Sequence, residues 1–203
     1  MPKQFHFYKK DIILNHSIKK FEKIKEIKEI YIALNKKYQK KYSPFVKKTK
    51  KIKFFNGGNY RSVSAKKGIE KLYQNYTHVL IHDAARPNFT IKLVLKLIKE
   101  LKKNSCVVPA ITSYDTTVFE KNYVDRSKIK FLQTPQAFDL KKIYKYHKKI
   151  KIKISQTTQF YFFKINKKSN LLMEKLIIKK LLLLRTSIQK INTMVLVMTY
   201  IKW

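Results

Sequence analysis

The chain has 203 residues and a formal net charge of +35 at pH 7, from 47 Lys and Arg against 12 Asp and Glu. Its one cysteine, Cys106, excludes an internal disulfide, and no Cys/His spacing suggests a zinc site. The N-terminal stretch MPKQFHFYKKD lacks the apolar core of a signal peptide, and no apolar run approaches the ~18 residues of a membrane span. We therefore expect a cytoplasmic protein with no membrane partner and one domain of ordinary size.

Apolar periodicity predicts alternating helices and strands as far as about residue 150. Residues 11–22 (DIILNHSIKKFE) place apolar side chains at helical spacing, and residues 29–34 and 52–55 have the pattern of short buried strands. A basic segment that we expect to be helical separates these two strands. A helix is predicted over residues 60–76, followed by a strand over 77–83.

The same alternation continues with a helix over residues 90–103, for which Thr90 is available as the N-cap, and a strand over 105–111. Strands that alternate with helices predict an α/β fold with a mostly parallel sheet. Ligands of such sheets bind beyond the carboxyl ends of the strands. Asp83 and Arg86, in the segment HDAARP, follow a predicted strand and stand at such an end.

Four segments together carry a family pattern, although each alone is weak. They are PKQF (2–5), GGNYRSVSAKKGI (57–69), HDAARP (82–87) and YDTTVFEKNYVDRSKIKFLQTPQAF (114–138). In this order and spacing they resemble the 2-C-methyl-D-erythritol 4-phosphate cytidylyltransferases, over about residues 2–148. The last two segments are the most specific part of the resemblance.

The resemblance implies a Rossmann-like nucleotidyltransferase sheet, a protruding dimerisation arm at residues 112–131 and a homodimer. It implies transfer of CMP from CTP to 2-C-methyl-D-erythritol 4-phosphate, which gives 4-diphosphocytidyl-2-C-methyl-D-erythritol and pyrophosphate in isoprenoid biosynthesis by the methylerythritol phosphate pathway. The implied cofactor is Mg²⁺. Because the substrate phosphate is already a nucleophile, catalysis requires positioning and cations rather than a strong base.

The site residues implied by the resemblance follow the same segments. Lys3, Asp83 and Arg126 are the expected catalytic residues: Lys3 contacts phosphate, Asp83 helps to hold Mg²⁺ and the substrates, and Arg126 of the partner subunit completes the site. The expected substrate-binding residues are Gly58, Asn59, Arg61 and Ser64 for the cytosine and ribose, Arg86 for the local geometry, and Thr116 and Thr134, with Arg126, for the methylerythritol phosphate.

Structural roles remain open for some of these residues. Ser64 could simply cap a turn, and Thr134 could simply brace Pro135. Asn59 stands where the family commonly has an acid. We expect His16 and His82 to be packed or surface residues rather than ligands.

The two ends of the sequence depart from the family pattern. The chain starts directly before Pro2, so residues 1–150 are expected to form a cytidylyltransferase domain without the family's first strand and glycine-rich phosphate loop. Residues 151–203 form a basic tail with one acidic residue and no Gly or Pro, and are expected to form no independent domain. An inactive fragment of the enzyme is therefore an alternative.

The composition of the tail suggests translation in the wrong reading frame. Methionine has a single codon. Reading the third base of each codon with the first two of the next therefore forces Gly at Met173-Glu174, Gly at Met194-Val195 and Asp at Met198-Thr199.

With permitted codons at the other positions, residues 155–159 can give TDDA and residues 170–186 can give FINGEINNKKITTTKD. These strings contain the Thr-Asp-Asp and Asn-x-Lys-Ile-Thr patterns that the tail otherwise lacks. Residues 194–202 can give GIGYDIHK, which resembles the opening of 2-C-methyl-D-erythritol 2,4-cyclodiphosphate synthase. The hypothesis is a gene for a bifunctional enzyme, with cytidylyltransferase first and synthase second; a divergent basic helical tail is the alternative.

Two other functions stay open. A positive field of this size attracts nucleic acid or anionic substrates. Lys, Ile, Asn and Tyr all have A/T-rich codons, however, and no nucleic-acid-binding motif is recognisable, so we do not expect nucleic acid as a partner. The second alternative is a nucleotidyltransferase for another sugar or alditol phosphate, against which the segment VDRSKIKFLQTPQAF argues.

Overall fold

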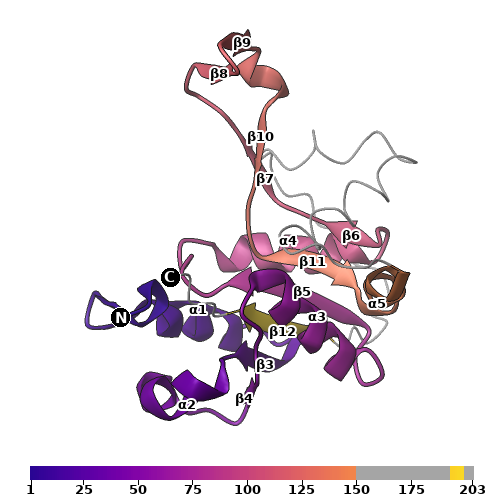
Figure 1. Ribbon diagram of the computed structural model, residues 1–203. Helices are drawn as coiled ribbons and strands as arrows, with labels where there is room; N and C mark the ends of the chain where they lie inside the picture. The colour runs from indigo at the N-terminus through magenta and orange to yellow at the C-terminus, as the bar shows by residue number, and fades with distance from the viewer. Residues whose placement is uncertain (150–192, 199–203) are drawn as a thin grey trace.

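A six-stranded sheet forms the centre of the protein. The computed structural model describes residues 1–149 and 193–198, and within them the sheet has the order β4-β3-β12-β5-β11-β6 (Figure 1). Strands β4, β3, β12 and β5 run parallel to one another, whereas β11 runs antiparallel to its neighbours β5 and β6. The predicted α/β class is therefore confirmed. No helix in the described part of the chain is long and apolar enough to cross a membrane.

The elements have the following bounds. The α-helices are α1 (Ile13–Glu22), α2 (Lys36–Tyr42), α3 (Arg61–Leu72), α4 (Ile91–Leu101) and α5 (Leu140–Lys149). The sheet strands are β3 (Ile27–Ala33), β4 (Ile52–Phe55), β5 (His78–Asp83), β6 (Cys106–Val107), β11 (Gln136–Asp139) and β12 (Thr193–Met198). The short elements are η1 (Lys3–Phe5), β1 (Phe7–Tyr8), β2 (Asp11–Ile12), η2 (Ser43–Phe45), β7 (Ala110–Thr112), β8 (Thr117–Phe119), β9 (Asn122–Val124), η3 (Arg126–Lys128) and β10 (Lys130–Leu132).

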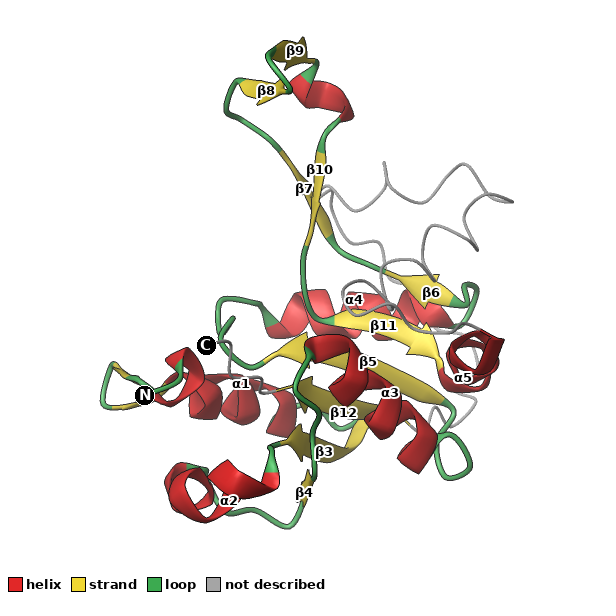
Figure 2. Ribbon diagram, in the orientation of Figure 1, coloured by secondary structure: helices red, strands yellow, loops and turns green. Residues whose placement is uncertain are grey.

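Helices cover both faces of the sheet, as Figure 2 shows. Side chains alternate along β5, so that Leu80 joins the core cluster under α1 and α4, whereas Val79 and Ile81 join the cluster under α3 and α5. A sheet buried on both faces explains why its strands are continuous apolar runs. His82, next along β5, is completely buried as well.

Most predicted elements are confirmed, with shifts of no more than four residues at their ends. Thr90 caps α4 as predicted: its Oγ1 accepts a hydrogen bond from the backbone N–H of Leu93 at 3.1 Å. The single strand predicted over residues 105–111 is wrong, because the structure divides it into β6 in the central sheet and β7 in a separate pair with β10. Pro109 lies between them and has no N–H to continue a ladder.

Strand β12 lies between β3 and β5. Its Val195 pairs with Ile30 on one side and Leu80 on the other, both in parallel register. The expectation that the domain lacks the family's first strand stays a prediction, and the position between β3 and β5 is filled by β12. The other expectations for the tail concern residues 150–192 and 199–203, which lie outside the described residues.

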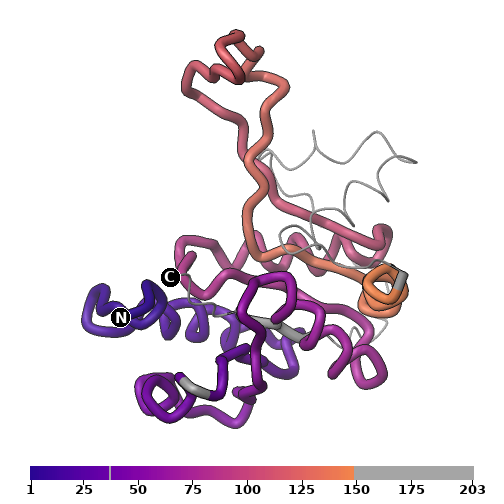
Figure 3. The backbone as a smooth tube through the Cα atoms, viewed as in Figure 1, coloured from indigo at the N-terminus to yellow at the C-terminus, as the bar shows by residue number. Residues whose placement is uncertain are grey.

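The predicted arm is present. Strands β7 and β10 pair antiparallel and lead away from the sheet to a tip that contains the hairpin β8–β9 and η3 (Figure 3). At the base, the N–H of Gln133 donates to the carbonyl of Pro109 at 2.7 Å. Apolar side chains on the arm are exposed, namely Ile111, Tyr114, Val118, Phe119, Tyr123 and Phe131.

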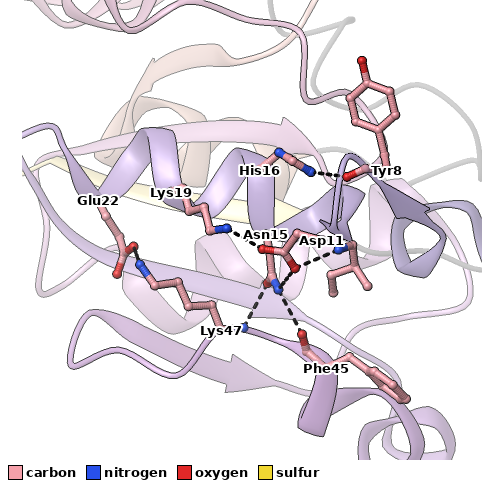
Figure 4. Close-up of polar contacts among 9 residues, drawn as sticks. Tyr8, Asp11, Asn15, His16, Lys19, Glu22, Phe45 and Lys47 are labelled. Carbon is pink, nitrogen blue, oxygen red and sulfur yellow. Dashed lines mark hydrogen bonds and ion pairs between the residues drawn. The ribbon is translucent and has the colours of Figure 1, made fainter.

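A buried asparagine ties the N-terminal hairpin to the rest of the fold (Figure 4). The Asn15 side-chain N–H groups donate to Asp11 Oδ1 at 2.7 Å and to the Phe45 carbonyl at 3.0 Å, and its Oδ1 accepts from the Lys47 N–H at 2.9 Å. Burial raises the pKa of Asp11, but hydrogen bonds from Lys19, Asn15 and the backbone outweigh it and leave the pKa lowered. This network connects α1 with β2 and with the chain around η2.

Candidate active site

The carboxylate of Asp83 marks the carboxyl end of β5. Its Oδ1 accepts a hydrogen bond from Arg61 Nε at 2.7 Å, and its Oδ2 lies 3.3 Å from Arg86 Nε. The Asp83 side chain is 15 % exposed, against 53 % for Arg86. Two guanidinium groups on one carboxylate leave a net positive charge, as an anion-binding site requires.

Local geometry explains the order Asp-Ala-Ala-Arg. The N–H of Arg86 donates to the carbonyl of Asp83 at 3.0 Å, so the chain turns at once after β5. Ala84 is buried inside this turn. The turn brings both charged groups to the same end of the strand, as the sequence predicted.

The segment QTPQ lies against this turn. Gln133 Oε1 accepts from Arg86 Nη1 at 3.2 Å, and Thr134 Oγ1 accepts from the N–H of Asp83 at 3.4 Å. The peptide bond between Thr134 and Pro135 is cis. Thr134 is thus beside Asp83, and its buried hydroxyl contacts the backbone of Asp83 and the ring of His82.

The glycine turn between β4 and α3 forms a second part of the site. The N–H of Gly58 donates to Ser64 Oγ at 2.9 Å, and Lys67 Nζ donates to the carbonyl of Gly57 at 3.3 Å. A Cβ atom on Gly58 would lie 2.6 Å from the Cβ of Val63, so only glycine fits there. Ser64 therefore closes the turn, which is the structural role considered above.

Asn59 and Lys3 are both exposed, on different elements. Asn59 Oδ1 accepts from Asn35 Nδ2 at 3.5 Å, and so connects the chain after β4 with the chain after β3. Both connections leave the carboxyl ends of parallel strands. Lys3 lies on η1, near the N-terminus of the chain.

The arm residues are not brought to Asp83 within one chain. Thr116 and Arg126 are exposed at the tip of the arm, which stands away from the sheet (Figure 1). Arg126 Nη1 donates to the carbonyl of Tyr114 at 2.8 Å, so the guanidinium is held against the arm itself. Asp125 caps η3, and hydrogen bonds from Ser127 lower the pKa of its carboxyl.

Sequence reasoning missed two contacts that support this end of β5. Lys20 Nζ donates to the carbonyls of Pro87 at 2.6 Å and Phe89 at 2.9 Å. His82 is enclosed between α1 and Thr134, and burial lowers its pKa to about 3. Strand alternation could have indicated His82, because a polar residue at a core position of a strand usually has partners. Nothing in the sequence indicated Lys20.

A divalent metal would find one carboxylate here. The described residues contain no group of three or more His, Cys, Asp or Glu side chains that could hold a metal ion. Asp83 is a hard oxygen ligand at the strand end, and Mg²⁺ in phosphoryl-transfer sites takes its other ligands from phosphates and water. The residues therefore fit Mg²⁺ only together with a phosphorylated substrate.

The parallel sheet, the glycine turn before α3 and the cationic strand end define an α/β protein of the nucleotidyltransferase class. A family model, 2-C-methyl-D-erythritol 4-phosphate cytidylyltransferase, matches residues 1–159. The chain belongs to this family.

Relatives and solved structures agree with this assignment. The chain is 40 % identical over 151 residues to the "Bifunctional enzyme IspD/IspF" of Pelagibacter ubique, and 32 % identical over 202 residues to the 2-C-methyl-D-erythritol 4-phosphate cytidylyltransferase of Caldicellulosiruptor bescii. These alignments cover 70 % and 88 % of this chain, and 39 % and 90 % of the relatives. The chain thus spans less than half of the bifunctional relative.

Among solved structures, the 4-diphosphocytidyl-2C-methyl-D-erythritol synthase of Anaerococcus prevotii is similar with a TM-score of 0.69 and 28 % identity, over 78 % of this chain and 74 % of that chain. The bifunctional IspDF of Campylobacter jejuni is similar with a TM-score of 0.65 and 29 % identity, over 80 % of this chain and 42 % of that chain.

Proposed function

We propose that the site transfers CMP from CTP to the phosphate of 2-C-methyl-D-erythritol 4-phosphate and releases pyrophosphate. The observation that carries the proposal is Asp83, held between Arg61 and Arg86 at the carboxyl end of β5. The arrangement belongs to a chain of the cytidylyltransferase family. A phosphate oxygen of the acceptor attacks the α-phosphorus of CTP, and the bond to the β-phosphate oxygen breaks.

The two arginines have different parts in this proposal. Arg61 is the more buried of the two and makes the shorter contact, 2.7 Å, so it orients the carboxylate of Asp83. Arg86 is half exposed with a contact of 3.3 Å, so it can turn toward an incoming phosphate at little cost. Asp83 would hold Mg²⁺, which supplies positive charge at the phosphates when bound.

The glycine turn would receive the nucleoside. With no side chain on Gly57 and Gly58, the backbone there can approach a base and ribose closely. Ser64 fixes the shape of the turn through its contact with Gly58. Asn59, exposed beside Asn35, offers amide donors and an acceptor to a polar ligand edge.

The arm supports a site shared between two copies of the chain. Exposed apolar residues gather on an arm that leaves the sheet, which is typical of a surface covered by another chain. In a two-fold dimer each arm would place Thr116 and Arg126 over the other subunit's Asp83. The guanidinium would then contact the phosphate of 2-C-methyl-D-erythritol 4-phosphate.

A substrate panel tests the reaction. The purified chain is incubated with Mg²⁺, 2-C-methyl-D-erythritol 4-phosphate and each of the four nucleoside triphosphates, and pyrophosphate release and the cytidylyl product are measured. We expect product with CTP only. Replacing the acceptor with another sugar or alditol phosphate should abolish it, and equal turnover with such an acceptor would contradict the proposed specificity.

Mixed dimers test the shared site. Arg126→Ala and Asp83→Asn each remove one half of a site, so each homodimer should be inactive. A mixed dimer keeps one complete site, and equal mixing should restore about a quarter of wild-type turnover if subunits exchange at random. If samples shown to contain mixed dimers recover no activity, the result would contradict a site shared between subunits.

A further inference from the structure

His82 has an unusual environment for a histidine at a strand end. Its side chain is completely buried, yet both ring nitrogens have hydroxyl partners. Nε2 lies 3.3 Å from Ser17 Oγ on α1, and Nδ1 lies 3.2 Å from Thr134 Oγ1. The ring also packs edge-on against Phe21 and Phe89, with centroid distances of 5.2 and 4.8 Å.

Thr134 connects this ring to the active site. The same Oγ1 that contacts His82 accepts the N–H of Asp83 at 3.4 Å. A continuous series of polar contacts therefore runs from Ser17 through His82 and Thr134 to the backbone of Asp83. The turn after Asp83 is held from the same helix, because Lys20 donates to Pro87 and Phe89.

One arrangement of protons satisfies both hydroxyl contacts of the ring, which also has a hydrogen bond with the backbone of Arg86. Thr134 Oγ1 already accepts from Asp83, so its own proton is available to donate to Nδ1 of His82. Nε2 then carries the ring proton and donates it to Ser17 Oγ. In the opposite tautomer Thr134 would accept twice, and among these contacts its buried hydroxyl proton would have no acceptor.

We propose that His82 is a positioning residue for cytidylyl transfer: it fixes the hydroxyl of Thr134 and thereby the backbone of Asp83. The inference rests on the proposed role of Asp83. It assigns to the histidine no contact with substrate. Fixing this backbone keeps the carboxylate of Asp83 in one position when its arginine partners turn to bind phosphates.

The test uses two substitutions at one position. His82→Phe keeps an aromatic ring between Phe21 and Phe89 but loses both polar contacts. His82→Asn keeps a polar group near the Nδ1 position. Ile143→Val, in the core on the other face of the sheet, is the control for a general loss of stability.

The first readout is hydrogen exchange at the backbone N–H of Asp83, which needs no activity. His82→Phe should speed this exchange at least about tenfold relative to the other amides of β5, and His82→Asn should restore much of the protection. Ile143→Val should not change the ratio. Unchanged relative exchange in His82→Phe would overturn the proposal, whether or not the chain transfers CMP.

The second readout is steady-state kinetics under conditions where every variant is folded. His82→Phe should lower kcat about tenfold or more with little change in the KM for CTP, because a misplacement of about 1 Å can cost ~100-fold. In a Thr134→Val background the same substitution should add little, since the path to Asp83 is already broken. Additive effects of the two changes would contradict action through Thr134. A folded wild-type chain that shows no turnover would refute the proposed function. The hydrogen-exchange measurement would then still test the role of His82.

Discussion

The buried imidazole of His147 should make the protein less stable in mildly acidic solution. His147 shares a helix face with Leu140 and Ile143, is 1 % exposed, and in the described part of the chain neither ring nitrogen has a hydrogen-bond partner. Burial first, and then the positive charge of Lys66, lowers its pKa to about 4. In an unfolded chain the pKa of histidine is about 6.5.

The direction of this pH effect on stability follows from the number of protons that the folded and unfolded chains bind. Between these two pKa values the unfolded chain binds a proton at His147 and the folded chain does not, so the free energy of unfolding falls as the pH falls. The slope is at most about 1.4 kcal/mol per pH unit. The contribution of the neutral His147 to the free energy of unfolding is complete above about pH 6.5. About 2 kcal/mol of this contribution is lost between pH 7 and pH 5.

Urea unfolding at pH 7, 6 and 5, followed by circular dichroism, measures this loss in the wild-type chain and in His147→Leu. Leucine removes two unpaired buried nitrogens at similar volume, so at pH 7 the variant should be at least as stable as wild type. The loss on going to pH 5 should be about 2 kcal/mol smaller in the variant. Equal losses, or a His147 ring that titrates near pH 6.5 by NMR, would refute the reasoning.

The other predictions concern backbone positions and the gene. Gly58→Ala should destabilise the protein by about 1–3 kcal/mol in urea unfolding and raise the KM for CTP, because the new Cβ meets Val63. Gly57→Ala is the milder control, since its Cβ would lie 3.2 Å from Ser64 Oγ. An equal loss of stability in the two variants would contradict this reasoning. Val195→Pro should lower the melting temperature by several degrees, since it removes an N–H from the central strand; an unchanged value would show that β12 adds nothing to the sheet. The DNA should spell GIGYDIHK in the shifted frame at residues 194–202, and codons that cannot do so would end the bifunctional hypothesis.

Local patterns account for much of this fold. The strand end at Asp83 and the cap at Thr90 were predicted because each depends on neighbouring residues only. The position of β12 was not predicted, since a short apolar run does not specify which strands it pairs with. The division of residues 105–111 depends on where the arm leaves the sheet, which apolar periodicity does not encode.

The candidate site likewise has a part that the sequence predicted and a part that it did not. Asp83 and Arg86 meet at the carboxyl end of β5, as their segment suggested. The ion pair between Arg61 and Asp83 was not predicted, since the sequence placed Arg61 with the residues expected to bind cytosine and ribose. The structural part of Thr134 and the support from Lys20 and His82 depend on contacts across more than 50 residues, between elements whose packing a single sequence does not reveal. Arg126 is exposed on the arm, and its expected role depends on a second copy of the chain.

Turnover of Asp83→Asn is the most direct measurement of the central claim, that Asp83 between two arginines is the centre of a cytidylyl-transfer site. Product formation from CTP and 2-C-methyl-D-erythritol 4-phosphate is followed by ³¹P NMR for wild type and variant, with circular dichroism to confirm equal folding. The substitution keeps the side chain's size but removes its charge. The wild-type chain should form product and the variant should be slower by at least about 100-fold, since it loses an interaction at the reacting phosphates. A folded variant with wild-type turnover, or a folded wild-type chain without any, would contradict the account.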